Sequence, residues 1–221
     1  MTAPGGWGAR CEAFVRERTD GDPAHDLSHV RRVVRWARRL AAEEGADLAV
    51  VVPAAWLHDC VGLAKDDPDR ARASRLAADA ASAWLAAEGC AAERVAAIAH
   101  AIEAHSFSAG VAPRTVEAAV VQDADRLDAL GAVGIARCYA TAGALGSALV
   151  HPDDPVPGVG AGRPLDDRRW ATDHFFAKLL GLPETMRTDA GRAEATRRVG
   201  VMRAFLDALA RETQDDEPAR P

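Results

Sequence analysis

The stretch DLAVVVPAAWLHDC, residues 47–60, joins a strong helix signal to two potential metal ligands. Asp47 is a favourable N-cap residue, and Pro53 comes early enough in the apolar run to be tolerated or to bend the helix. A helix that only fills a core would continue with leucine or alanine, or end at a cap. This one ends in His58 and Asp59. The rest of the chain has to show whether other ligands join this pair.

The rest of the chain also favours helix. Aromatic residues make up only 5% of the 221 residues, and β-branched residues are mostly isolated valines. Apolar residues recur at spacings of three and four, which is typical of amphipathic helices. We expect helices over about 8–18, 24–45, 47–59, 67–89, 91–105, 114–129, 131–145, 168–181 and 189–212.

These elements predict an all-α fold with a single domain over residues 1–213. Its core is expected over about 25–130. A Pro/Gly-rich loop at 151–167 precedes the last two helices, and such long loops are usually functional or mobile. The charged end of the chain, 214–221, is expected to be a disordered tail.

Composition excludes several classes of protein. A net charge of −6 argues against a nucleic-acid binder. Arginines gather in the second helix with helical spacing, which favours a solvated helix face over phosphate-backbone binding. They are Arg31, Arg32, Arg35, Arg38 and Arg39. The four cysteines form no CxxC pattern, and neither a signal peptide nor a membrane span is recognisable. We expect a cytoplasmic protein without a membrane or nucleic-acid partner, and a homodimer remains open.

Three segments place polar side chains on apolar helix faces. His29 lies beside the stripe that contains Val33, although a single histidine there is more often a hydrogen-bonded core residue than a ligand. His58 shares a face with Val51, Ala54 and Ala55, and a buried Asp59 beside it needs a counter-charge.

A further helix carries three carboxylates, Asp123, Asp125 and Asp128, and only Arg126 is adjacent to them in the sequence. These carboxylates repel one another unless something cationic lies among them. A divalent cation would resolve the cost of all these groups together. Two imidazoles with two carboxylates suit a transition metal better than calcium or magnesium.

The motifs AHDLSHVRRV (24–33), LHDCVGLAKDDPDRARAS (57–74), AHSFS (104–108), VQDADRLDALGAVGIAR (121–137) and RPLDDRRWATDHFFAKLLGLPETMRT (163–188) resemble those of a known family. The H…HD…D pattern is similar to that of HD-domain metal-dependent phosphohydrolases. Within that superfamily, the motifs resemble uncharacterised bacterial proteins related to HD-type nucleotide pyrophosphatases. The resemblance implies an all-helical HD domain with His29, His58, Asp59 and Asp125 as metal ligands.

The resemblance also implies the function. We expect an enzyme that hydrolyses a phosphoester or phosphoanhydride, with a nucleotide as the leading substrate, by metal-activated water. One divalent transition metal is expected, from the group Mn, Co, Ni, Fe and Zn, with Mn preferred. A second metal near His100 and His105 is less favoured, because residues five apart on a helix point about 140° away from each other.

Further residues are assigned to the reaction. Asp59 and Asp128 are the expected catalytic carboxylates, with Asp128 receiving a proton or orienting the attacking water. Substrate phosphate is expected to contact Lys65, Arg72, His105 and Lys178. His25, one helical turn before His29, more simply supports the site than binds the metal.

Two other interpretations remain. A non-catalytic nucleotide sensor or interaction module would use the same ligands to hold a structural metal, which protein ligands would saturate. An HD-type di-iron oxygenase would need two extra histidines to converge on the site, and the spacing of His100 and His105 argues against it.

Overall fold

The computed structural model describes residues 6–18, 27–62, 72–106, 109–157 and 162–213. The chain is all-α, as predicted, and the only pairing of β type among these residues is a single bridge between Ala148 and Trp170. No helix in these ranges combines the length and apolar character needed to cross a membrane.

The chain divides into two compact units, each described separately below. The first contains Met1–Asp128 and Met186–Arg192, and the second contains Ala129–Thr185 and Ala193–Pro221. The first unit thus includes a short segment, Met186–Arg192, that contains the start of the last helix. The single domain expected over 1–213, with a core at about 25–130, stays a prediction.

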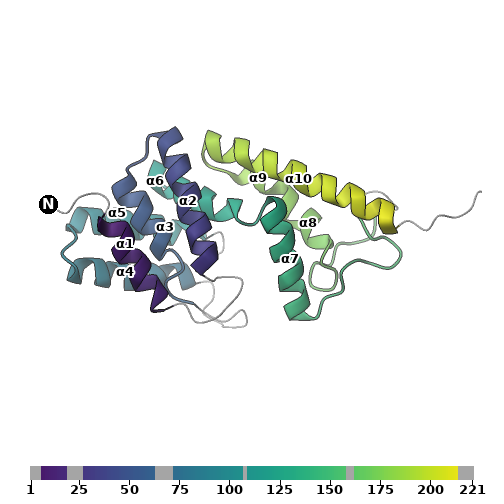
Figure 1. Cartoon of the computed structure of the whole chain (residues 1–221), viewed down its shortest axis with the longest axis horizontal. Helices are drawn as coiled ribbons and strands as arrows, with labels where there is room; N and C mark the ends of the chain where they lie inside the picture. The colour runs from purple at the N-terminus through teal and green to yellow at the C-terminus, as the bar shows by residue number, and fades with distance from the viewer. Residues whose placement is uncertain (1–5, 19–26, 63–71, 107–108, 158–161, 214–221) are drawn as a thin grey trace, which may run out of the picture. The chain divides into compact units, whose positions relative to one another are not determined.

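The first unit surrounds one buried helix, α3. Its helices are α1 (Gly6–Arg16), α2 (Leu27–Glu44), α3 (Leu48–Leu57), α4 (Ala73–Ala87), α5 (Ala92–His105) and α6 (Val116–Leu127). Every residue of α3 from Val50 to Leu57 is buried, Pro53 included, and α1, α2, α5 and α6 pack against it (Figure 1). This is the run from which the sequence predicted a core helix.

Sequence signals explain how these helices begin. The Asp47 side chain accepts a hydrogen bond from the Ala49 N–H at 2.7 Å, which confirms the predicted N-cap of α3. Thr115 caps α6 in the same way through the Ala118 N–H. The first residues of the helix expected over 67–89 lie outside the described residues, and the described helix α4 begins at Ala73.

The second unit contains α7 (Gly131–Leu145), α8 (Asp173–Ala177), the 3-10 turn η2 (Leu179–Gly181), α9 (Leu182–Thr185) and most of α10 (Asp189–Thr213). The continuous helix expected over 168–181 is wrong. Residues 167–172 instead form turns that a single bridge joins to Ala148, with the Ala148 N–H bonded to the Arg169 carbonyl and the Ala171 N–H to the Ala148 carbonyl.

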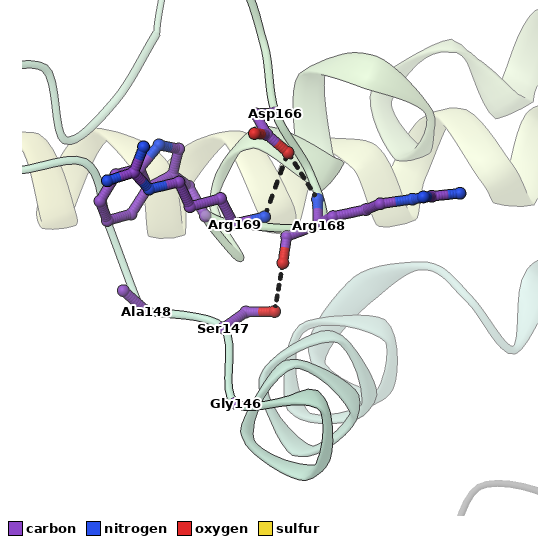
Figure 2. Close-up of a pocket in the computed structure, with 7 residues that line it drawn as sticks. Gly146, Ser147, Ala148, Asp166, Arg168 and Arg169 are labelled. Carbon is purple, nitrogen blue, oxygen red and sulfur yellow. Dashed lines mark hydrogen bonds between the residues drawn. The ribbon is translucent and has the colours of Figure 1, made fainter.

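A turn at Asp166 stabilises this non-helical conformation. The Asp166 carboxylate accepts the backbone N–H groups of Arg168 and Arg169, and Ser147 donates to the Arg168 carbonyl (Figure 2). An open pocket of about 500 Å³ lies along this turn. Local hydrogen bonding by an aspartate thus outweighs the amphipathic pattern.

The Pro/Gly-rich loop is anchored by a charge pair. Arg163 donates to both oxygens of the fully buried Asp173 at 2.6 Å, and also to the Asp154 carbonyl. Asp173 additionally accepts the Asp166 N–H at 2.7 Å. These bonds keep the described part of the loop against the start of α8.

Candidate metal centre

The ends of four helices meet at one cluster of imidazoles and carboxylates. His29 stands in the first turn of α2, His58 and Asp59 follow α3, Asp125 lies in the last turn of α6, and His105 is the last residue of α5. His29 and His58 are 1% and 0% exposed, as their positions on apolar faces predicted. The structure therefore brings together the residues expected from the sequence.

The distances within the cluster match a shared cation. His29 Nε2 lies 3.3 Å from His58 Nε2, 3.5 Å from Asp125 Oδ1 and 3.8 Å from Asp59 Oδ2. His58 Nε2 lies 3.4 Å from Asp59 Oδ2 and 3.8 Å from Asp125 Oδ1. Ligands that each bind one ion at about 2.0–2.2 Å lie about 3–3.6 Å apart at octahedral or tetrahedral angles. Small adjustments would bring these atoms to one centre.

Hydrogen bonds fix the tautomer of each histidine. His29 Nδ1 donates to Asp128 at 2.7 Å, His58 Nδ1 donates to the Ala55 carbonyl at 2.9 Å, and His105 Nδ1 donates to the Ile102 carbonyl at 2.6 Å. In a neutral imidazole the other nitrogen then carries a lone pair. All three Nε2 atoms face the carboxylates, an arrangement that repels unless a proton or a metal lies between them. The donor set therefore fits a divalent metal ion.

The close approach of imidazoles and carboxylates also shifts the pKa values of His58 and Asp59. Burial alone would lower the pKa of His58, but the charge of Asp59, its hydrogen bond and the charge of Asp125 raise that pKa to about 9. Burial would raise the pKa of Asp59, whereas His58 and His105 hold it well below its usual range. The carboxylates thus favour a protonated His58, and a metal would take the place of that proton.

His105 lies on the other side of Asp59. Its Nε2 atom is 3.6 Å from Asp59 Oδ1, and its ring centroid is 4.9 Å from that of His58. A second set of metal-ligating atoms therefore consists of His58, Asp59 and His105, beside the set of His29, His58 and Asp125. His58 offers one free lone pair, so it can bind a metal in only one of the two sets at a time.

His100 does not join the cluster. Its Nε2 atom accepts a hydrogen bond from the Arg114 N–H at 3.0 Å, and it lines a separate pocket with Glu103 and Arg75. The two histidines of α5 thus diverge, as the helical spacing predicted. The pair of converging histidines that a di-iron oxygenase would need is not formed by His100 and His105.

Asp128 occupies a different place from the one its expected catalytic role requires. It is 3% exposed, and its carboxylate accepts from His29 Nδ1 and from the Arg32 guanidinium. It therefore lies behind the imidazole, away from the Nε2 atom that faces Asp59 and Asp125. A role as proton acceptor for water on the metal side does not fit this geometry.

Asp123, which lies in α6 two residues before Asp125, has a structural role. It is fully buried and accepts hydrogen bonds from the backbone N–H groups of Arg187 and Thr188 and from the Thr188 hydroxyl, at 2.8–3.0 Å. This contact attaches the segment Met186–Arg192 to the first unit. Asp123 thus faces a backbone turn, Asp125 faces the cluster, and Asp128 faces the His29 imidazole.

The other residues expected to contact substrate are more scattered. Lys65, like His25, lies outside the described residues. Arg72 is an exposed residue immediately before α4, and Lys178 is an exposed residue immediately after α8 in the second unit. The contacts expected for Lys65, Arg72 and Lys178 stay predictions.

Sequence reasoning placed Arg32 among solvated arginines, and this was wrong. Its Nε and Nη2 atoms donate to the two oxygens of Asp128 at 2.6 and 3.0 Å. Its spacing from His29 was the available signal, because residues three apart lie on neighbouring faces of a helix.

Comparisons with known proteins agree with this geometry. Residues 26–130 match the model of the HD domain. The uncharacterized protein YpgQ of Bacillus subtilis is 35% identical over 195 residues, which cover 86% of this chain and 85% of YpgQ. The crystal structure of YpgQ in complex with ADP has a TM-score of 0.74 and 32% identity, covering 95% of this chain and 96% of YpgQ.

A second solved relative carries a functional description. The structure of an HD-superfamily hydrolase from Bacillus thuringiensis has a TM-score of 0.73 and 31% identity, covering 95% of this chain and 98% of that protein. Sequence and fold agree over almost the whole chain, and the H…HD…D residues meet where the HD model matches. The chain therefore belongs to the HD superfamily.

Proposed function

We propose that this protein is a metal-dependent phosphohydrolase that cleaves a phosphoester or phosphoanhydride bond of a nucleotide. The observation that carries the proposal is the convergence of His29, His58, Asp59 and Asp125. Their Nε2 and carboxylate oxygen atoms lie 3.3–3.8 Å apart in the pairs described above. We assign these four residues as the ligands of one divalent metal.

The chemistry divides between the metal and the chain. When bound, a divalent cation would supply Lewis-acid activation of water and of a phosphoryl oxygen. His29 and His58 each commit Nδ1 to a hydrogen bond, so Nε2 is the atom that would bind the cation, and binding would release the proton that His58 holds in the metal-free cluster. Asp59 turns Oδ2 toward these imidazoles and leaves Oδ1 facing His105. We assign to Oδ1 a hydrogen bond from the attacking water.

The second imidazole beside Asp59 suits an anionic substrate. His105 lies at the end of α5 with Nε2 inside the cluster and Nδ1 committed to a carbonyl. We assign to its imidazolium form a hydrogen bond donated from Nε2–H to a substrate phosphate oxygen. Lys65, Arg72 and Lys178 are proposed to neutralise charge that develops on the phosphoryl group.

The donor set also supports a choice of metal. Two imidazoles and two carboxylates suit a transition metal of borderline softness, and four protein ligands on an ion that tolerates six leave positions for water and substrate. We propose Mn²⁺ as the preferred ion, with Co²⁺, Ni²⁺, Fe²⁺ and Zn²⁺ as alternatives.

A nucleotide is the proposed substrate class because a relative binds one. YpgQ, with 32% identity over nearly the whole chain, was crystallised with ADP. This supports a nucleoside diphosphate or triphosphate as ligand of the present protein. A pyrophosphatase that releases pyrophosphate from a nucleoside triphosphate is the preferred form of the activity.

The test is a panel of nucleoside mono-, di- and triphosphates and simple phosphomonoesters. Each is assayed with Mn²⁺, Co²⁺, Ni²⁺, Zn²⁺ and Mg²⁺, for the wild type and for Asp59→Ala. We expect metal-dependent release of phosphate or pyrophosphate that disappears in the variant. Equal rates for both proteins would contradict the mechanism. Tight metal and nucleotide binding without turnover of any substrate would instead favour a nucleotide sensor.

A further inference from the structure

Arg32 and Asp128 form a charge pair directly behind the metal centre. The Arg32 Nε and Nη2 atoms reach separate oxygens of the carboxylate at 2.6 and 3.0 Å. This two-point contact fixes the plane of the carboxylate as well as its position, which a single ammonium group does not do. Arg32 Nη1 also donates to the Ser28 hydroxyl at 2.9 Å, one turn earlier on α2. The guanidinium is therefore held from two sides.

The same carboxylate orients a proposed metal ligand. Asp128 Oδ2, which receives the bond from Arg32 Nη2, also accepts the bond from His29 Nδ1 at 2.7 Å. The Asp128 side chain is 4% exposed and that of Arg32 is 26% exposed. Little water can replace either partner at Asp128. The direction of the His29 ring, and hence of Nε2, depends on where this carboxylate is held.

The three groups close a small ring between two helices. Arg32 and His29 are three residues apart on α2, and Asp128 immediately follows α6, which packs against α2. The ring connects the helix that carries His29 to the helix that carries Asp125. A change in the position of Asp128 would therefore alter the separation of two proposed ligands.

We propose that Arg32 is a positioning residue of the metal centre and acts through Asp128. Arg32 holds the carboxylate so that His29 keeps Nδ1–H turned toward Asp128 and its Nε2 lone pair turned toward Asp59 and Asp125. Arg32 itself touches neither metal nor substrate. The inference rests on the proposed metal centre, and it assigns Asp128 an orienting role in place of the catalytic role expected from the sequence.

The test measures metal affinity of the full chain, independently of turnover. Mn²⁺ is titrated into metal-free protein, and the free ion is quantified by electron paramagnetic resonance. Arg32→Met is the test variant. Arg31→Met is the matched control, because the neighbouring Arg31 is exposed and pairs with Glu12. Removing the outer partner of a ligating histidine typically weakens metal binding about 10–100-fold.

Because Arg32 acts through Asp128 rather than on His29 directly, we expect Arg32→Met to raise the Kd for Mn²⁺ by about 10-fold, the lower end of that range. The Kd of Arg31→Met should stay within about twofold of the wild-type value, because exposed ion pairs contribute little. Arg32→Lys should fall between Arg32→Met and wild type, since it keeps the charge but loses the planar fork. The visible spectrum of the Co²⁺-loaded protein should change in Arg32→Met and not in Arg31→Met.

A double-mutant cycle separates positioning from a general effect on folding. If Arg32 acts through Asp128, then Arg32→Met should weaken Mn²⁺ binding in the wild type but have little further effect in Asp128→Asn. Equal losses in both backgrounds would overturn the proposal even if the variants were less stable. Thermal unfolding of the metal-free proteins identifies any variant that has lost its fold.

The outcomes distinguish this inference from the proposed function. If the wild type binds none of Mn²⁺, Co²⁺, Ni²⁺ and Zn²⁺, the metal centre itself is wrong. If the wild type binds Mn²⁺ and Arg32→Met binds it as tightly as Arg31→Met does, only the role of Arg32 is overturned.

Discussion

Two acidic sites in this chain, one half-buried and one buried, differ in what faces the carboxylate. Asp125 of the first unit faces two imidazole nitrogens, His29 Nε2 at 3.5 Å and His58 Nε2 at 3.8 Å. Asp173 of the second unit faces the guanidinium of Arg163, which donates to both oxygens at 2.6 Å. Asp173 is neutralised by the permanent charge of the Arg163 guanidinium, whereas the imidazoles that face Asp125 are cationic only when they are protonated. The first arrangement is suited to bind a cation, and the second holds a loop in place.

The strongest test of this contrast is Asp125→Asn. We expect more than about 100-fold weaker Mn²⁺ binding and loss of hydrolysis, because a ligand is removed rather than an outer partner. The metal-free variant should be at least as stable as the metal-free wild type, since one charge leaves a cluster that lacks its cation. Titration with Mn²⁺ and thermal unfolding without metal measure the two effects. A metal-free variant that unfolds at a clearly lower temperature would assign Asp125 a structural role.

The counterpart, Asp173→Asn, should have the opposite pattern. It leaves the Arg163 guanidinium without its carboxylate, and breaking a buried pair of this kind costs about 3 kcal/mol or more. Urea unfolding of metal-free protein should show this loss in the free energy of unfolding. If Asp173→Asn is as stable as the wild type, the Arg163–Asp173 pair does not stabilise the fold and the contrast with Asp125 fails.

Asp123 provides a further comparison, because it lies in the same helix as Asp125, α6, but has different partners. Asp123 of α6 is held by backbone N–H groups, and a Cβ atom added at Gly191 would lie 2.5 Å from its Oδ2 atom and 2.6 Å from Thr188 Oγ1. Gly191→Ala should therefore destabilise the protein by about 1–3 kcal/mol through overpacking.

Gly200→Ala is the matched control, because Gly200 lies in the same helix, α10, with no atom near the added Cβ. It should raise stability by up to about 1 kcal/mol through helix propensity. Denaturant unfolding of both variants checks the signs. Similar effects at the two positions would mean that the contact at Asp123 does not restrict Gly191.

Helical periodicity was enough to place the two histidines inward, whereas the choice of Asp125 among three carboxylates came from the family resemblance. His29 and His58 could be placed inward because each shares a face with apolar residues, and both are almost fully buried. Asp123, Asp125 and Asp128 look equivalent in the sequence, because their roles depend on partners that are distant in the chain. Asp125 and Asp128 contact His29, and Asp123 contacts the backbone at Arg187. Arg32 lies three residues after His29, but its pairing with Asp128 joins residues 96 positions apart and so could not be predicted from the helix pattern.

The error at 168–181 has a similar cause. The amphipathic pattern there predicts a helix, but Asp166 binds two backbone N–H groups and Ala148 pairs with the following residues. Helix propensity is a weak preference, and such local and long-range hydrogen bonds outweigh it. The fold class, by contrast, depends on many helices at once and was predictable.

The smallest expected effect concerns two histidines of one helix, α5. His105 donates through Nδ1 and turns Nε2 into the cluster, whereas His100 uses Nε2 to accept the Arg114 N–H at 3.0 Å. Protonation of His100 would remove that acceptor. Burial, and then the nearby charge of Arg114, lower the pKa of His100 below its ordinary value of 6.5. The folded protein therefore favours neutral His100.

This depressed pKa fixes the sign of a pH effect on stability. The contribution of His100 is fully present above about pH 6.5, where the imidazole is neutral in both states. Below that pH the unfolded chain binds the proton first, so stability falls until the folded pKa is passed. Because His100 is partly exposed, the total change should be less than about 1 kcal/mol.

In His100→Gln the amide oxygen can accept the same N–H without titrating, so the free energy of unfolding of this variant should fall less between pH 7 and 5 than that of the wild type. Both proteins are compared without metal, so that the titration of the cluster is common to them. Parallel profiles would show that the bond from Arg114 does not depend on the charge of His100, and the contrast between the two histidines of α5 would then rest on position alone.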